Sequence, residues 1–109
     1  DSCRYDDFAD KFHGDRGAVF ARVLQGQYFH LMQSQLTLLE IAISGHSHGL
    51  VHENSTIQTC WDADRLDLGR VGIYPDSKYL SFAAMKYTSN AYEWSRRASL
   101  TKIKSAISL

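Results

Sequence analysis

Residues 28–43 read YFHLMQSQLTLLEIAI, and this stretch decides the fold that the sequence predicts. Aromatic and branched side chains dominate its two runs, Tyr28–Gln33 and Leu36–Ile43. The polar pair Ser34 and Gln35 separates the runs, and apolar runs bounded by polar residues are typical of β-strands. The sequence therefore predicts two neighbouring strands here.

A helix is predicted before these strands, over residues 15–24 with the sequence DRGAVFARVL. Val19 and Val23 form one apolar pair four residues apart, and Phe20 and Leu24 form another. Side chains four residues apart lie on the same face of a helix. An acidic residue at the start and a glycine just after the end support these boundaries.

Three further runs are predicted strands because they are rich in branched and aromatic residues. Two predicted turns interrupt them: residues 45–49, GHSHG, and residues 74–77, YPDS, with proline in second place. The predicted strands are Thr56–Trp61, Leu66–Tyr74 and Tyr79–Thr88.

A second helix is predicted to begin at Asn90, because Glu93 follows three residues later as in a capping box. The fold class that results is α+β: an N-terminal helix packed on an antiparallel sheet of four to five strands, with a C-terminal helix. The apolar face of the C-terminal helix is predicted to consist of Trp94, Ala98, Leu100, Ile103 and Ile107.

The length of 109 residues predicts a single domain, residues 1–109, and 44% hydrophobic residues are enough for a core. No apolar run approaches the roughly 20 residues that cross a bilayer, so no membrane association is expected. The sequence holds no glycine-rich phosphate loop, Cys-x-x-Cys pair or nucleophile elbow. We therefore expect no cofactor, and we also expect a monomer.

Three weak signals favour a secreted protein. The chain begins at Asp1, as a mature product does after its leader is removed. Cys3 and Cys60 are predicted to form a disulfide, although two free thiols in a cytosolic protein are the alternative. Asn54 opens the glycosylation motif Asn-Ser-Thr.

Charge is divided unevenly along the chain, although the formal net charge is zero. Residues 1–67 carry ten acidic and five basic residues, whereas residues 68–109 carry two acidic and seven basic residues. A phosphate-bearing partner would therefore meet the second part, unless the opposite charges pair across the fold.

Three histidines, His46, His48 and His52, are weak candidates for a metal site. Imidazoles bind zinc or copper, and Glu53 or Cys60 would complete the ligand set. The spacing matches no established zinc pattern, so we prefer a loop with solvated histidines.

A third group of residues has the order Tyr28, His30, Glu53 and Arg70, followed by the segment 82–90 with Tyr87. This order resembles the small secreted fungal ribonucleases of the T1 class. The resemblance implies that Glu53 or His30 is the general base and that Arg70 stabilises the phosphorane charge. It implies that Tyr87 stands where that family has its general-acid histidine, and a phenol with an ordinary pKa near 10 is a poor acid at neutral pH.

The resemblance implies a degenerate scaffold of the kind found in ribonuclease-like fungal effectors, which act as virulence proteins in a host. We therefore predict a secreted, non-enzymatic effector that binds host RNA or a host protein. The alternatives are a small toxin, immunity protein or inhibitor that acts through a protein surface, and an active ribonuclease that uses His30, Glu53 and Arg70.

Overall fold

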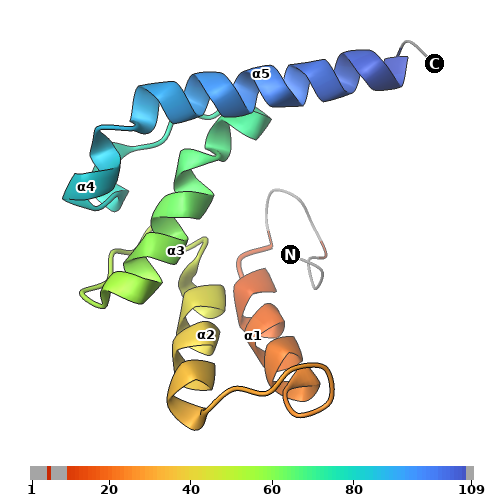
Figure 1. Ribbon diagram of the computed structural model, residues 1–109, viewed down its shortest axis with the longest axis vertical. Helices are drawn as coiled ribbons and strands as arrows, with labels where there is room; N and C mark the ends of the chain where they lie inside the picture. The colour runs from red at the N-terminus through yellow and green to blue at the C-terminus, as the bar shows by residue number, and fades with distance from the viewer. Residues whose placement is uncertain (1–4, 6–9, 108–109) are drawn as a thin grey trace. The chain divides into compact units, whose positions relative to one another are not determined.

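Figure 1 shows the computed structural model, which describes Tyr5 and residues 10–107, the side chain of Ile107 excepted. Over this range the secondary structure consists of five α-helices and two short 3-10 helices. In chain order they are α1 (His13–Leu24), α2 (Gln33–Gly45), α3 (Ser55–Leu66), η1 (Leu68–Val71), η2 (Ser77–Tyr79), α4 (Phe82–Met85) and α5 (Thr88–Ile107).

The predicted α+β fold is wrong, because residues 10–107 form no β-strand and no sheet. A single isolated bridge joins Gln25 to Phe29 in this range. The two predicted helices are confirmed as α1 and α5, each of which begins two residues earlier than expected. The predicted turn after residue 45 is also confirmed, over residues 46–49.

The predicted strand at Leu36–Ile43 is part of α2, and its burial pattern shows why. Leu36 is buried and Ile43 partly buried at a spacing of seven, whereas Thr37 and Ile41, four apart, are exposed. This is the period of a helix, not the alternation of a strand. A short apolar run does not distinguish the two periods by composition alone.

The predicted strand at Thr56–Trp61 lies in α3, where buried residues also follow a helical period. They lie at intervals of one and three along α3, namely Ile57, Gln58, Trp61, Asp62 and Arg65. The side-chain oxygen of Asn54 accepts hydrogen bonds from the backbone N–H groups of Thr56 (2.9 Å) and Ile57 (3.3 Å). Asn54 therefore caps the helix, since an N-cap side chain satisfies N–H groups of the first turn.

The predicted strand at Tyr28–Gln33 is the irregular connection between α1 and α2, apart from Gln33, which begins α2. The two remaining predicted strands are short helical turns joined by irregular segments. Leu66–Tyr74 contains the end of α3 and η1, and Tyr79–Thr88 contains α4 and the start of α5. Ser81 caps α4, because its Oγ accepts a hydrogen bond from the N–H of Ala84 at 3.2 Å.

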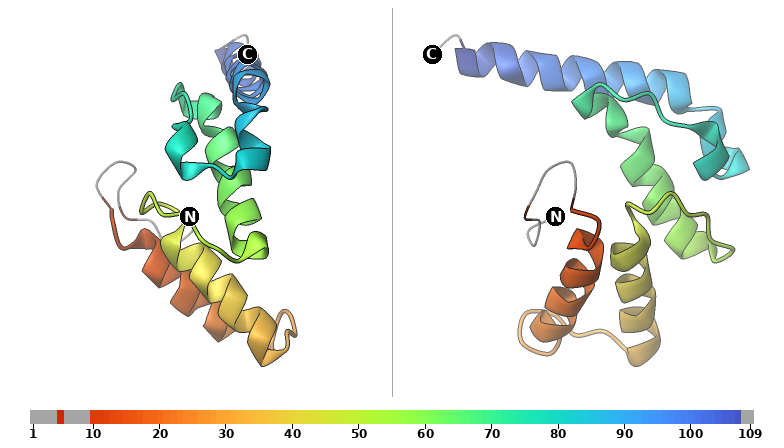
Figure 2. Two further views of the ribbon diagram at one scale, coloured as in Figure 1. Left: turned by 90° about the vertical axis from the view of Figure 1, so that its left-hand side faces the viewer. Right: turned by 180° about the vertical axis from the view of Figure 1, so that it is seen from behind.

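The chain divides into two compact units, Asp1–Gln58 and Thr59–Leu109. In the first, α1 and α2 form an antiparallel hairpin that the views of Figure 2 show side by side. Gly14 lies at the closest approach, where an added Cβ would stand 2.6 Å from the carbonyl oxygen of Ser44. Polar pairs join the two helices along their length: Arg22 with Glu40, Asp15 with Ser44, and His13 with His46.

The carboxylate of Asp10, three residues before α1, binds both Arg16 and Tyr5. Arg16 donates a hydrogen bond to this carboxylate, and the backbone N–H of Tyr5 donates another at 2.6 Å. The Arg16 guanidinium also lies over the ring of Tyr5, 3.9 Å from its centroid. The hydrogen bond from Arg16, followed by that from Tyr5, lowers the pKa of Asp10 to about 2.

In the second unit, a buried polar network joins the end of α3 to the segment before α4. The carboxylate of Asp62 accepts hydrogen bonds from Ser81, at 2.9 Å from its N–H and 2.6 Å from its hydroxyl. Arg65 donates to the carbonyl oxygen of Tyr79, and burial lowers the pKa of Arg65. Asp62 and Arg65 are both more than nine-tenths buried, which makes this network costly to break.

Gly69 sets the distance between η1 and α5 in the second unit. An added Cβ at Gly69 would stand 2.5 Å from the carbonyl oxygen of Tyr92 and would overlap the hydroxyl of Ser95. Ser99 donates a hydrogen bond to the carbonyl of Arg70 at 2.8 Å, one turn further along α5. Glycine is therefore required where η1 meets α5.

We expect Gly69→Ala to destabilise the protein by about 1–3 kcal/mol, because the methyl group forces η1 away from α5. Chemical denaturation measures this loss. Ser47→Ala, in the exposed turn after α2, is the control and should change stability by less than about 0.5 kcal/mol. Equal stability of the two variants would contradict the close packing at Gly69.

We expect Asp10→Asn to destabilise the protein near neutral pH but not in strong acid. The folded pKa of Asp10, about 2, lies below its ordinary value of 3.8. The carboxylate therefore contributes stability above the unfolded pKa, and this contribution is lost as the pH falls through about 2. Melting temperatures of wild type and Asp10→Asn should converge as the pH falls, while the exposed control Glu53→Gln shows no such convergence.

Candidate binding groove

Trp94 is a large apolar side chain that the second unit leaves 69% exposed. Trp94 lies on α5 between two hollows, of about 550 Å³ and about 420 Å³. Trp94 and Asp67 line both hollows. We call these hollows together the Trp94 groove. The larger is lined by Ala63, Leu66, Asp67, Tyr87, Asn90, Ala91 and Trp94, and the smaller adds Arg70, Val71, Ser95, Ala98, Ser99 and Lys102.

Helical spacing places these side chains on facing surfaces. Ala63 and Leu66 lie three residues apart at the end of α3, and Asp67 follows directly after it, four residues from Ala63. Trp94 on α5 lies seven residues after Tyr87, which directly precedes this helix. Because residues at these intervals share a helix face, each element presents one stripe to the hollow.

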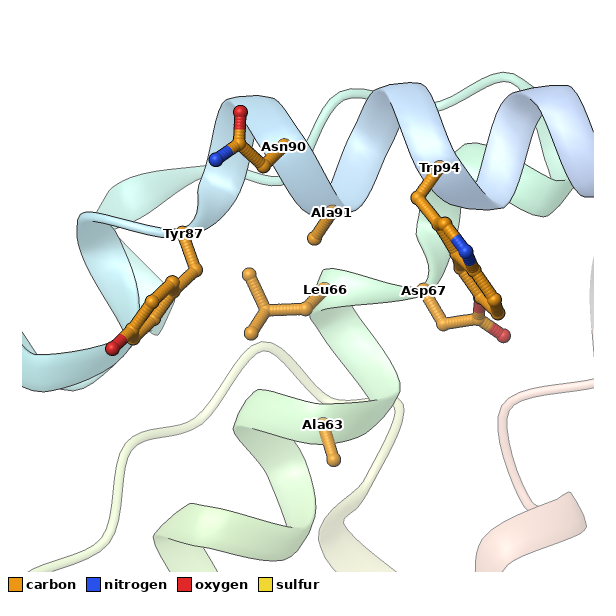
Figure 3. Close-up of a pocket in the computed structure, with 7 residues that line it drawn as sticks. All are labelled: Ala63, Leu66, Asp67, Tyr87, Asn90, Ala91 and Trp94. Carbon is orange, nitrogen blue, oxygen red and sulfur yellow. The ribbon is translucent and has the colours of Figure 1, made fainter.

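The larger hollow is apolar and is walled by aromatic rings. Figure 3 shows Tyr87 and Trp94 on opposite sides, with Leu66 between them. Ala63 and Ala91 carry only a methyl group each and leave the space open. Tyr87 is 53% exposed, so both rings are available to a ligand. Apolar hollows with a few polar groups at the edge are typical of binding sites.

The smaller hollow is bordered by positive charge. Arg70 and Lys102 line it, and Arg96, Arg97 and Lys104 lie on the same helix as Lys102. Arg70 contacts the carboxylates of Asp67 at 3.4 Å and Asp64 at 3.9 Å. All three of these side chains are at least 40% exposed, so the pairing is weak, and the Arg70 guanidinium also donates a hydrogen bond to the carbonyl oxygen of Asp67 at 3.0 Å.

The predicted apolar face of α5 is not its buried face. Ser95 is buried to 2% exposure, whereas Trp94, Leu100 and Ile103 are at least 42% exposed. η1 explains this difference, because Gly69 packs directly on Ser95. A groove could have been predicted from the helical spacing of four residues, Tyr87, Asn90, Ala91 and Trp94. Recognising this spacing requires a helix that begins before Asn90, where the sequence analysis placed its start.

The residues of the ribonuclease resemblance lie in separate segments. Tyr28 and His30 are exposed in the connection between α1 and α2, and Glu53 is exposed just before α3. Arg70 lies in η1 and Tyr87 precedes α5, both in the second unit. The resemblance requires a sheet to carry them, and residues 10–107 form none, so a ribonuclease-like scaffold is wrong.

The three histidines of the metal hypothesis are not gathered together. His46 contacts His13, while His48 is exposed in the turn that follows α2. The Nδ1 of His52 accepts the backbone N–H of Asn54 at 3.0 Å, next to the cap of α3. Within the described residues, no group of three or more His, Cys, Asp and Glu side chains is arranged to hold a metal ion.

The structure describes only some of the residues on which the predicted secretion rests. Cys60 is exposed on α3, and Cys3 lies outside the described residues, so their disulfide stays a prediction. Asn54 is half-buried, with its side-chain oxygen engaged in the cap of α3. Within the described residues, every helix is too short or too polar to span a membrane.

Comparison with known proteins gives no family for this chain. No protein-family model, curated protein or solved structure matches it. The chemistry and geometry of the Trp94 groove are therefore the basis on which a function can be proposed.

Two substitutions at Asn54 separate its structural role from glycosylation. Asn54→Ala should cost about 0.5–2 kcal/mol, because the cap of α3 is lost. Asn54→Asp should keep most of the stability, since a carboxylate also accepts the N–H groups, while it removes the glycosylation motif. Denaturation of the unglycosylated protein measures both variants. Equal destabilisation by both would contradict the capping role.

Proposed function

We propose that this chain is a non-enzymatic binding protein that holds an acidic, hydrophobic segment of a partner protein in the Trp94 groove. The exposure of Trp94 beside an apolar hollow is the observation that carries this proposal. An indole left in water costs free energy that a partner's apolar side chain recovers on binding. Tryptophan and arginine are also the side chains that most often dominate protein interfaces.

The charge around the groove supports an acidic partner. The helix α5 carries Arg96, Arg97, Lys102 and Lys104 against the single acid Glu93. Basic groups beside an apolar hollow attract a segment with carboxylates next to its anchoring side chain. Asp67, which lines both hollows, disfavours a polyanion seated directly in the groove.

Our proposal about where the protein acts is based on the sequence alone. The predicted disulfide and the glycosylation motif at Asn54 favour action outside the producing cell, and we propose that the partner is a host protein. An inhibitor, toxin or immunity protein would use the same kind of surface. The partner's identity distinguishes these settings.

Fluorescent peptides test the groove directly. One set carries a leucine or tryptophan anchor flanked by glutamates, and a matched set carries the same anchors flanked by lysines. We expect the acidic set to bind the full chain more tightly, and Trp94→Ala to weaken binding by about thirtyfold, as loss of a central anchor does. Fluorescence polarisation measures both effects.

Matched variants control for changes elsewhere on the surface. Phe82→Ala removes an aromatic side chain that is 90% exposed but does not line the groove, and binding should be unchanged. Lys102→Glu should weaken acidic peptides more than Lys104→Glu, because only Lys102 lines a hollow. Peptide binding that is indifferent to Trp94 would contradict the proposal. Single-stranded RNA that binds through Trp94 would replace it with nucleic-acid recognition.

A further inference from the structure

Ser99 lies on α5 and lines the smaller hollow of the Trp94 groove, together with Arg70 and Lys102. Its hydroxyl donates a hydrogen bond to the carbonyl oxygen of Arg70 at 2.8 Å, and the residue is partly exposed. Water can satisfy both groups when such a contact at the surface opens, so losing it costs little. The hydroxyl of Ser99 is therefore a polar group that can be modified without disrupting a core.

The sequence around this serine has the pattern that basophilic protein kinases phosphorylate. It reads Arg96-Arg97-Ala98-Ser99-Leu100, with two arginines two and three positions before the serine and an apolar residue directly after it. Carboxylates of such a kinase bind the two guanidinium groups through charge-assisted hydrogen bonds. Arg97 and Leu100 are both exposed, so the pattern lies at the surface of the second unit.

Three basic side chains are near enough to Ser99 to hold a phosphate there. Arg96 and Lys102 lie three residues before and after it on α5, so they are its neighbours on the helix surface. Arg70 lines the same hollow, and the guanidinium of Arg96 lies at the end of η1, where an added Cβ on Gly72 would stand 3.2 Å from its Nη1. A phosphate beside such a cluster gains charge-assisted hydrogen bonds.

The part of α5 that follows Ser99 is open to an enzyme. Residues 100–106 are all exposed, so backbone hydrogen bonds within the helix supply most of the order of this end. Helix ends with little packing open at a small cost in free energy. Opening from this end presents Ser99 and its arginines in the extended form that a kinase cleft accepts.

We propose that Ser99 is a phosphorylation site for a basophilic serine kinase, and that the phosphate closes the smaller hollow to acidic partners. The Ser99 oxygen attacks the γ-phosphorus of ATP and forms a new P–O bond. The bond from this phosphorus to the β–γ bridging oxygen breaks, ADP leaves, and the hydroxyl proton passes to the catalytic aspartate of the kinase. ATP is present inside cells, so the modification takes place where the chain acts within its host.

The effect on binding rests on the proposed function of the Trp94 groove. A phosphoserine carries a charge of about −1.5 to −2 at pH 7, and Arg70 and Lys102 are the basic residues that line the smaller hollow. The exposed carboxylate of Asp67 contacts Arg70 at 3.4 Å, and a dianion competes well with such a weak pair. The phosphate then repels the carboxylates of a partner segment.

Incubation of the folded full chain with MgATP and a purified basophilic kinase, the catalytic subunit of cyclic-AMP-dependent protein kinase, tests the modification. Intact and fragment mass spectra should show one phosphate, located on Ser99, and none in Ser99→Ala. Arg97→Gln should slow the transfer by about tenfold or more, because it removes one of the two guanidinium groups that the kinase binds. Lys104→Gln, an exposed basic residue outside the pattern, is the matched control and should keep the wild-type rate.

A synthetic peptide of residues 92–105 shows whether the fold permits the reaction. Transfer to this peptide but not to the folded chain would overturn the modification, because α5 would then protect Ser99. Phosphate on Ser105, which lacks the paired arginines, and none on Ser99 would also overturn it.

Fluorescence polarisation with the glutamate-flanked and lysine-flanked peptides tests the effect on the groove. Phosphorylated wild type should bind the acidic peptides about tenfold more weakly than the unmodified chain, without weakening for the lysine-flanked set. Ser99→Ala after the same kinase treatment should keep its affinity. Equal affinity before and after phosphorylation would overturn the effect on the groove. If the unmodified chain binds no acidic peptide, the proposed function fails together with this effect, while the mass spectra still decide the modification.

Discussion

The close contact of η1 with α5 at Gly69 is the constraint on which the second unit depends. The chain leaves α3, turns through η1 and is held against Ser95 because glycine leaves no side chain between them. This contact, together with the hydrogen bond from Ser99 to Arg70, fixes the end of α3 beside the start of α5. The Trp94 groove is the space that remains between these two elements, so its shape follows from the backbone contact.

Buried polar groups give the second unit its specificity. Asp62 and Arg65, one helical turn apart on α3, bind the hydroxyl and backbone groups of the segment between η2 and α4. Side chains of α3 therefore help to determine the path of that segment. Buried charged groups used in this way order a loop more than they add stability, because the cost of desolvating them offsets much of what their hydrogen bonds contribute.

The sequence predicted the two helices with clear boundary signals, but not the fold class. α1 has paired apolar residues, and α5 has a long regular pattern, so helical spacing was evident in both. In α2, the run of branched residues from Leu36 to Ile43 suited a strand in composition, and only the burial of Leu36 with the partial burial of Ile43, seven residues later, shows its helical period. The His13–His46 contact was beyond prediction, because it joins residues 33 positions apart through the hairpin register.

The contrast between Trp94 and Trp61 gives the molecule two optical reporters. Trp61 is 2% exposed inside the second unit, whereas Trp94 is 69% exposed at the groove. A buried indole emits at shorter wavelength and resists aqueous quenchers, while a solvated indole emits further to the red and is quenched readily. The intrinsic emission of the unmodified chain therefore contains separable signals from its core and its surface. A molecule that covers Trp94 should shift the emission of this indole to shorter wavelength, so its binding can be followed without a label.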